Sequence, residues 1–116
     1  MTSIVRIEPG PRMSRAVIHG DTLYLAGQVS TDGSTDVAGQ TRDVLARVDE
    51  ALAAGGSDKS KLLSVTIWIT DISRFGEMNA VWDAWVDPTN PPARATVEAR
   101  LASPNYLVEI AAIAAR

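Results

Sequence analysis

The sequence contains no cysteine, and histidine occurs only once, at position 19. Without cysteine, the chain has no disulfide framework, no thiolate nucleophile and no cysteine-ligated zinc or iron–sulfur site. A single histidine also excludes a multi-histidine metal site within one chain. We therefore expect a protein whose chemistry uses no bound metal.

Long apolar runs and clusters of like charge are also missing. No apolar segment approaches the ~20 residues that span a bilayer, and the N-terminal stretch MTSIVRIEPG does not have the pattern of a signal peptide. The 11 basic and 14 acidic residues give a net charge of -3 without any basic cluster. We expect a cytoplasmic protein that binds neither nucleic acid nor membranes.

The composition that remains is that of an ordinary globular chain. Its 116 residues are 46% hydrophobic and 22% charged. A chain of this length folds most commonly as one domain with one core. We expect a single domain over residues 1–116.

The clearest local pattern is the segment SRAVIHGDTLYLAGQ, residues 14–28. Two runs rich in β-forming residues flank Gly20-Asp21, which suits a two-residue hairpin turn. This turn predicts three facing pairs: Ile18 with Leu23, Ala16 with Leu25, and Val17 with Tyr24.

The spacing of apolar residues predicts two helices. From Asp36 onward they recur every three or four positions, until Gly55-Gly56 ends the pattern. A second helix is predicted with Ser73 as its N-cap. Its stripe consists of Phe75, Met78, Val81, Trp82 and Trp85, and we interpret the two tryptophans as core or interface packing.

Strands are predicted at KLLSVTIWITD and at residues 94–101 and 106–115. The element order indicates an α+β fold with one sheet of five or six strands and both helices on one face. The last strand carries apolar residues on both of its faces and therefore needs cover on both sides. Since two helices cover only one face, the sequence predicts a homo-oligomer.

Two charged residues in these last strands are candidates for chemistry. Arg94 begins one strand, and Glu109 is the only charge within YLVEIAAIAA. Because a short turn joins the two strands, we expect them to pair and to bring Arg94 close to Glu109. The pair is then either a structural ion pair or a site in which Arg94 holds an anionic substrate while Glu109 handles a proton or a water.

Other polar residues give weaker signals. Thr96 shares a strand face with Arg94 and could donate its hydroxyl, although threonine is also simply common in strands. Asn79 interrupts the second helical stripe and lies on the surface unless that helix borders a pocket. His19, beside the hairpin turn, is expected to be solvated.

The segments LYLAGQ, NPPARATVEARL and VEIAAIAA, in this order around two helices, resemble the Rid (reactive intermediate deaminase) family, also called the YjgF-like or L-PSP endoribonuclease family. The resemblance runs from about residue 14 to the C-terminus. It implies a chorismate-mutase-like fold and a trimer with ligand clefts between subunits. It also implies that Arg94 binds a substrate carboxylate, that Glu109 is associated with the hydrolytic water, and that Asn79 and Gly27 lie at the cleft.

Two positions depart from the pattern of the family. Met13 stands where a tyrosine is often found shortly after the N-terminal Gly-Pro, and Thr96 replaces a cysteine two residues after the arginine. The first change bears on substrate identity. The second bears less on imine hydrolysis, which needs no thiol nucleophile.

The function that this resemblance implies is the cofactor-free hydrolysis of small enamine or imine acids, of the 2-aminoacrylate type, to 2-keto acids and ammonia. An alternative, motivated by Met13 and Thr96, is a carboxylate-binding sensor or carrier that uses the same cleft without turnover. An RNA-cleaving or translation-inhibiting role ranks last, because the chain is acidic and has no basic groove.

Overall fold

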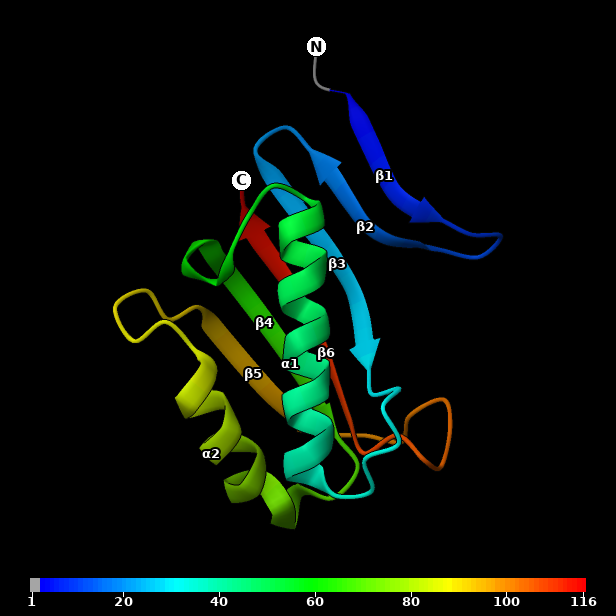
Figure 1. The fold of residues 1–116 in the computed structure, drawn as a ribbon, viewed down its shortest axis with the longest axis vertical. Coiled ribbons are helices and arrows are strands. Elements are labelled where there is room, and N and C mark those ends of the chain that lie inside the picture. The colour runs from blue at the N-terminus through cyan, green and yellow to red at the C-terminus, as the bar shows by residue number, and fades with distance from the viewer. Residues whose placement is uncertain (1–2) are drawn as a thin grey trace.

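A computed structural model describes residues 3–116 and contains one six-stranded mixed sheet with two α-helices on one face (Figure 1). The strands are β1 (Ile4–Pro9), β2 (Ser14–His19), β3 (Thr22–Val29), β4 (Leu62–Ile69), β5 (Ala93–Glu98) and β6 (Val108–Ala115). The helices are α1 (Val37–Ala54) and α2 (Phe75–Trp85), with short 3-10 turns η1 (Lys59–Lys61) and η2 (Ile72–Arg74). The predicted α+β architecture is confirmed.

The hairpin that joins β2 and β3 has the predicted register. Gly20 adopts a φ of 63°, in the left-handed region that glycine tolerates best. The facing pairs are those expected: Ala16 with Leu25, Val17 with Tyr24, and Ile18 with Leu23. His19 lies exposed beside the turn, also as predicted.

Helix α1 begins and ends at the predicted residues. The Asp36 side chain accepts a hydrogen bond of 2.6 Å from the Gly39 amide, which satisfies one free donor of the first turn. At the other end Gly56 adopts a φ of 77°, a conformation that stops the helix. Within residues 3–116 no helix, α1 included, combines the length and the apolar composition needed to cross a bilayer.

Helix α2 begins later than predicted, and the expectation that Ser73 is its N-cap is wrong. The 3-10 turn η2 precedes α2, and Asp71 caps this turn by accepting bonds from the Ser73 amide at 3.0 Å and the Ser73 hydroxyl at 2.7 Å. These bonds hold the pKa of Asp71 below its ordinary value. The serine hydroxyl therefore donates to an aspartate instead of accepting from the helix.

The two final strands do not pair with each other, so the predicted β5–β6 contact is wrong. The strand order is β1-β2-β3-β6-β4-β5, which places β6 between β3 and β4. Strand β5 pairs in parallel with β4 at the sheet edge, and α2 forms the crossover between them. A strand that is apolar on both faces is buried best at the centre of the sheet, and this explains why β6 takes that place.

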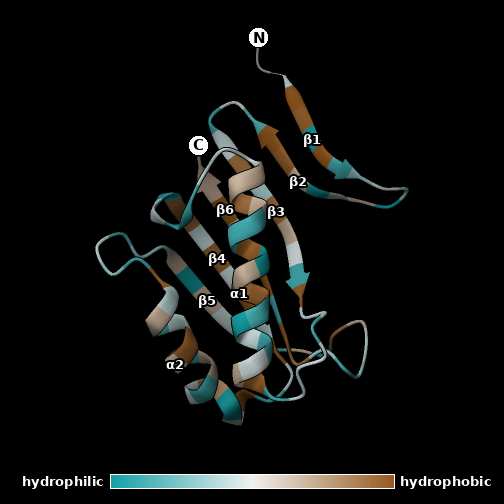
Figure 2. Ribbon diagram, in the orientation of Figure 1, coloured by the Kyte–Doolittle hydropathy of each residue, from teal (hydrophilic) through white to brown (hydrophobic). Residues whose placement is uncertain are grey.

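The core lies between the helices and one face of the sheet. Figure 2 shows brown, hydrophobic residues along the strands and on α1. Leu23, Leu45, Ile67 and Ile110 are all 0–1% exposed in this layer. The opposite face of the sheet has no helix over it, and Tyr24 is 43% exposed there, although its facing partner Val17 and neighbour Ile113 are apolar. The expected shortage of cover is confirmed for the single chain.

A pair of glycine substitutions tests the packing of α1 on the sheet. A Cβ atom at Gly55 would lie 2.5 Å from Cδ1 of the fully buried Leu23, whereas a Cβ at Gly76, in α2, would meet nothing within 4 Å. We expect Gly55→Ala to lower the free energy of unfolding by about 1–3 kcal/mol through overpacking. Gly76→Ala should raise it by about 0.5–1 kcal/mol through helix propensity. Denaturant unfolding of both variants checks the prediction, and equal effects would contradict it.

Candidate functional site

Arg94 lies on the helix side of the sheet, under α2. It is in register with the buried Val65 of β4, and paired residues project from the same face. Its guanidinium carbon lies 5.0 Å from the ring centroid of Trp82 and 5.7 Å from that of Phe75. The two aromatic rings of α2 therefore hold the guanidinium by cation–π contact.

Arg94 forms no ion pair within residues 3–116. Glu109, its expected partner, is in register with Trp68, three positions along β4 from Val65, and so projects from the opposite face of the sheet. Two strand spacings and three residues also separate them, about 10 Å in each direction. The alternative of a structural Arg94–Glu109 bridge is therefore wrong for the single chain, and the guanidinium is left without an anion.

Two further predicted residues join Arg94. Thr96 lies two positions along the same face of β5, and Asn79 lies between Phe75 and Trp82 on the face of α2 that carries them. Oγ1 of Thr96 and Oδ1 of Asn79 are both buried and have no hydrogen-bond partner. We call Phe75, Asn79, Trp82, Arg94 and Thr96 the Arg94 cluster. It offers a fork of N–H donors beside two unsatisfied polar atoms.

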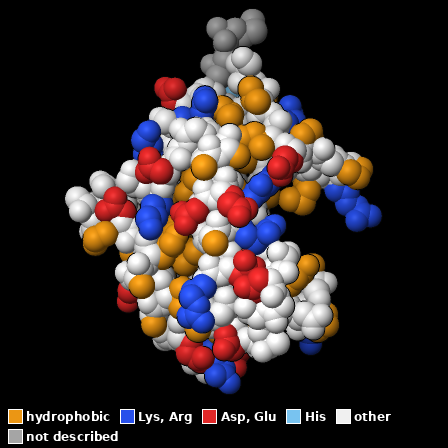
Figure 3. All heavy atoms as spheres, viewed as in Figure 1, with side chains coloured by type: hydrophobic (Ala, Val, Ile, Leu, Met, Phe, Trp, Pro, Cys, Tyr) orange, Lys and Arg blue, Asp and Glu red, His pale blue; other side chains and the backbone are white. Residues whose placement is uncertain are grey.

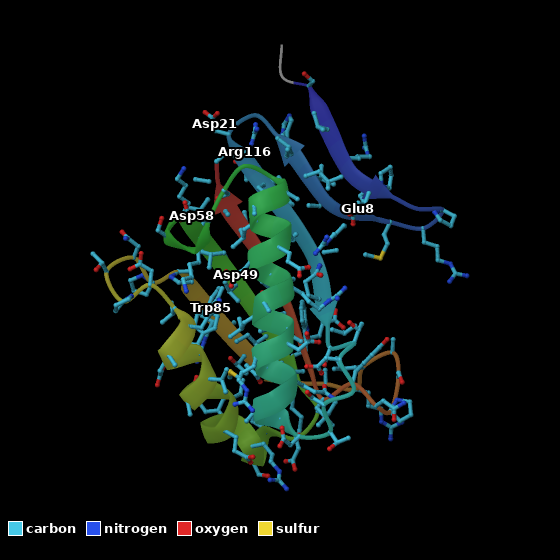
Figure 4. The ribbon with its side chains drawn as sticks, viewed as in Figure 1. Glu8, Asp21, Asp49, Asp58, Trp85 and Arg116 are labelled. Carbon is cyan, nitrogen blue, oxygen red and sulfur yellow. The ribbon has the colours of Figure 1, made fainter. Side chains whose placement is uncertain are left out.

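Met13 and Gly27 lie elsewhere, in a hollow of about 470 Å³ beside the β1–β2 turn and α1. We call it the Met13 hollow; its lining includes Met13, Arg15, Ala26, Gly27, Arg47 and Glu50. Arg15 bridges Glu8 at 3.4 Å and Glu50 at 3.1 Å, and Arg47 donates to Thr31 Oγ1 at 3.0 Å. Figure 4 shows Glu8 at this side of the molecule, on β1.

Glu109 adjoins Gly27 and not Arg94. A Cβ atom at Gly27 would collide with the Glu109 carboxylate, whose Cδ would lie 2.9 Å away. Glycine at this position therefore leaves the space that the carboxylate occupies. The Glu109 side chain therefore lies beside Gly27, on the face of the sheet that the helices leave open.

The predicted site residues therefore form two separate groups in one chain. Gly27 on β3 and Arg94 on β5 are separated by β6 and β4, which is about 14 Å of sheet. Four buried side-chain atoms lack a hydrogen-bond partner within residues 3–116: Asn79 Oδ1, Thr96 Oγ1, Arg15 Nε and Arg47 Nε. The first two lie in the Arg94 cluster, and the two arginines line the Met13 hollow. Such atoms are rare in folded proteins, so both groups are candidate binding surfaces.

Comparison with known proteins identifies the chain. The family model described as Endoribonuclease L-PSP matches residues 3–116. A RutC family protein of Haemophilus ducreyi is 46% identical over 112 residues, which cover 97% of this chain and 96% of that protein. The chain belongs to the L-PSP endoribonuclease family, also called the YjgF or Rid family.

Solved structures of this family share the fold. A YjgF family member from Neisseria meningitidis aligns with a TM-score of 0.95 and 44% identity, covering 98% of this chain and 95% of that one. A member of the conserved Rid family from Yersinia pestis aligns with a TM-score of 0.88 and 29% identity over the full length of both chains. The fold implied by the resemblance is confirmed.

For this Rid family chain, sequence reasoning missed the aromatic half of the Arg94 cluster and the arginines of the Met13 hollow. Phe75 and Trp82 belong to an apolar stripe that fits ordinary core packing. On the same face of the helix, only the polar Asn79 indicates that this face could border a binding site. Arg15 and Arg47 are 32 residues apart, and no sequence spacing connects them.

The chemistry of the Arg94 cluster suits an anion. Within residues 3–116, no three His, Asp or Glu side chains converge as a metal site would require. The prominent charged groups are arginines, which bind planar carboxylates through paired N–H donors. The Arg94 cluster, in which the guanidinium is not paired with an acid, is the stronger candidate.

Two threonine substitutions test whether the buried hydroxyl of Thr96 contributes to the stability of the folded chain. Thr96→Val removes a buried hydroxyl that has no partner, so we expect the free energy of unfolding to stay equal or to rise by about 1 kcal/mol. Thr41→Val, the matched control, removes a buried hydroxyl that donates to the Val37 carbonyl at 2.7 Å, and should lower it by about 1 kcal/mol. If Thr96→Val destabilises as much as Thr41→Val in denaturant unfolding, its hydroxyl has a structural partner.

Proposed function

We propose that this protein hydrolyses small enamine or imine acids of the 2-aminoacrylate type to 2-keto acids and ammonia. The observation that carries the proposal is the Arg94 guanidinium, which lies against two aromatic rings and, in the described part of the chain, forms no ion pair with an acid. A partly desolvated cation of this kind favours a planar anion. A 2-imino acid supplies such a planar carboxylate.

In this proposal Arg94 binds the substrate carboxylate through two N–H donors. The Thr96 hydroxyl donates a further bond to the carboxylate, and Asn79 Oδ1 accepts one from the imino N–H. Both atoms are buried in the chain without ligand and form no hydrogen bond within residues 3–116. Binding would therefore remove the free-energy cost of burying them without a partner. The reacting carbon is thereby fixed in one orientation.

The chemical step needs only water. The enamine tautomerises to the imine, and a water adds its oxygen to the imine carbon to give a carbinolamine. One proton of this water passes to the nitrogen. The hydroxyl then gives its remaining proton to the nitrogen as the carbon–oxygen double bond forms, the carbon–nitrogen bond breaks, and ammonia leaves the 2-keto acid. Glu109 accepts and returns the proton, directly or through a second water, as a general base and acid. The sequence of steps requires no cofactor and no metal.

Glu109 can take this role only if a second copy of the chain supplies it. Arg94 and Glu109 lie on opposite faces of one sheet, so one chain cannot bring them together. Glu109 lies on the open, apolar face expected to form the subunit interface, and Arg94 lies on the edge strand β5, which a neighbouring subunit can reach. We infer a homotrimer in which the Arg94 cluster of one subunit meets Gly27, Met13 and Glu109 of the next. Each interface then contains one complete site.

The alternative of binding without turnover uses the same Arg94 contact and differs only in whether Glu109 activates a water. An RNA-cleaving activity, which the family description names, would need phosphate contacts along a basic surface. The chain carries a net charge of -3, and the arginines of the Met13 hollow are already paired or hydrogen-bonded. Imine hydrolysis is therefore the function we test first.

Arg94→Lys tests the proposed carboxylate contact. Lysine keeps the charge and loses the planar fork, so we expect kcat/KM for 2-aminoacrylate generated in situ to fall at least about tenfold. Because Arg94 forms no ion pair with any of residues 3–116, the melting temperature should change little. Keto acid release and thermal unfolding are measured on the same preparation.

The matched control is Arg6→Lys, an exposed arginine on the other edge strand, β1, which should leave both quantities unchanged. A lower melting temperature with unchanged carboxylate affinity in Arg94→Lys would make Arg94 structural. Pyruvate binding by calorimetry without any turnover of the imine would support the sensor or carrier instead.

Mixed trimers test whether two subunits share each site. Arg94→Lys and Glu109→Gln, whose residual activities are first measured separately and then subtracted, are mixed in equal amounts, unfolded and refolded together. If every site combines Arg94 of one subunit with Glu109 of its neighbour, about one quarter of the sites regain both native residues by random assembly. We expect about a quarter of the wild-type rate of keto acid release.

The control for this experiment is the double variant, mixed with itself, which can restore no site. Recovery of half of the activity or more, or of none in a trimer verified by sedimentation, would contradict a shared site. A monomer at micromolar concentration would remove the interface on which the site depends.

A further inference from the structure

A second cavity lies on the outer side of the helix layer, between α1 and α2. This groove has a volume of about 610 Å³, and its lining includes Ala38, Arg42, Leu45, Ala84 and Trp85. Figure 3 views this side of the molecule and shows hydrophobic side chains between charged ones along the two helices. We call it the helix groove. It shares no lining residue with the Arg94 cluster or the Met13 hollow.

Small residues create the groove. Three alanines, Ala38, Ala80 and Ala84, occupy positions on the two helices where larger side chains would fill the seam. Leu45, which is 1% exposed, and Val81 supply apolar surface at its base. The seam therefore presents an apolar slot to solvent instead of a closed helix–helix contact.

The far end of the slot is closed by an aromatic side chain held in place. Trp85 donates from Nε1 to Asp49 Oδ2 at 2.9 Å, and Figure 4 shows these two residues meeting from α2 and α1. Lys59 lies 5.2 Å above the Trp85 ring. A flat apolar molecule in the slot would therefore lie beside a fixed indole ring.

The charges along the slot favour an anion. Arg42 and Lys59 line it, and within residues 3–116 Arg42 forms no ion pair. The acid in the lining, Glu77, already accepts a bond of 2.9 Å from Arg74, and this bond raises the pKa of Arg74 above its ordinary value. Asp49 accepts the bond from Trp85 and is also occupied. Lys59 lies over the Trp85 ring, so both Arg42 and Lys59 are available to bind an anion, and Arg42 is the one that does not stack on an aromatic side chain.

We propose that the helix groove is a second binding site, for a flat apolar carboxylate such as a bicyclic aromatic acid. Its carboxylate pairs with Arg42, and its rings lie over Leu45, Val81 and Ala84 toward Trp85. The volume is within the range of about 300–1,000 Å³ typical of small-ligand sites. Helix α2 has 11 residues and is about 16 Å long, which suits such a molecule better than a docked protein.

This proposal does not depend on the proposed deaminase function. The helices lie on the face of the sheet opposite to the one that we expect to form the subunit interface, so the groove stays open to solvent in a trimer (Figure 1). A ligand there would contact α2 on one side while Arg94 contacts Trp82 on the other side of the same helix. Groove and cluster are therefore separable by mutation.

The test is an NMR titration of the ¹⁵N-labelled full chain with 2-naphthoate and, in parallel, with the neutral 2-naphthylmethanol. Saturable shifts should concentrate at the amides of Leu45, Ala80 and Ala84. Ala84→Leu fills the slot at an exposed helical position. We expect it to lower the affinity for both probes at least about tenfold. Arg42→Gln should lower the affinity for 2-naphthoate about three- to fivefold, which is the range of an exposed ion pair. The affinity for 2-naphthylmethanol should stay unchanged.

Two control variants match these changes. Ala46→Leu, an exposed alanine of α1 outside the groove lining, and Arg6→Gln on β1 should leave both affinities unaltered. The proposal is overturned if 2-naphthoate gives no saturable shifts at its solubility limit. It is equally overturned if binding survives Ala84→Leu and is lost in Arg94→Lys, because the probe then occupies the Arg94 cluster. Turnover of the imine, present or absent, decides nothing about the groove.

Discussion

The central strand β6 sets the main constraint on this molecule. Its residues alternate between the helix side, where Val108, Ile110, Ala112 and Ala114 are 0–3% exposed, and an open side that carries Ala111 and Ile113. The two helices can cover only one of these surfaces. The other surface remains apolar and uncovered in the single chain, which is the physical reason to expect further copies of the chain against it.

The same constraint decides where the candidate site lies. Placing β6 at the centre moves β5, with Arg94, to one edge of the sheet and leaves Met13 and Gly27 near the other. One chain therefore does not bring the two groups of candidate residues together. A deaminase built on this fold would therefore depend on assembly for activity as well as for burial of its open face.

Within the Arg94 cluster, the arrangement of side chains costs stability in the single chain. A guanidinium held against Phe75 and Trp82 without an acid, beside buried polar atoms of Asn79 and Thr96 that have no partner, is less stable than a neutral apolar packing of similar volume. The helix groove differs in kind, because its apolar slot and the exposed Arg42 leave no buried polar group unsatisfied. We expect the cluster to be selective and the groove to be weaker and more permissive.

The sequence alone determined the features that depend on neighbouring residues. The Gly20-Asp21 turn, the start of α1 at Asp36 and its end at Gly55-Gly56 follow from local hydrogen bonds and from backbone conformations that few residues adopt. The two-sided apolar pattern of β6 likewise predicted an uncovered sheet face. Only the tertiary structure decided that α2 connects β4 to β5 in parallel, so that β6 enters between β3 and β4. Strand order depends on contacts between residues far apart in the chain, and these set the face from which each side chain projects. For that reason the sequence could select Arg94 and Glu109 as candidates, but could not show that one chain holds them on opposite faces of its sheet.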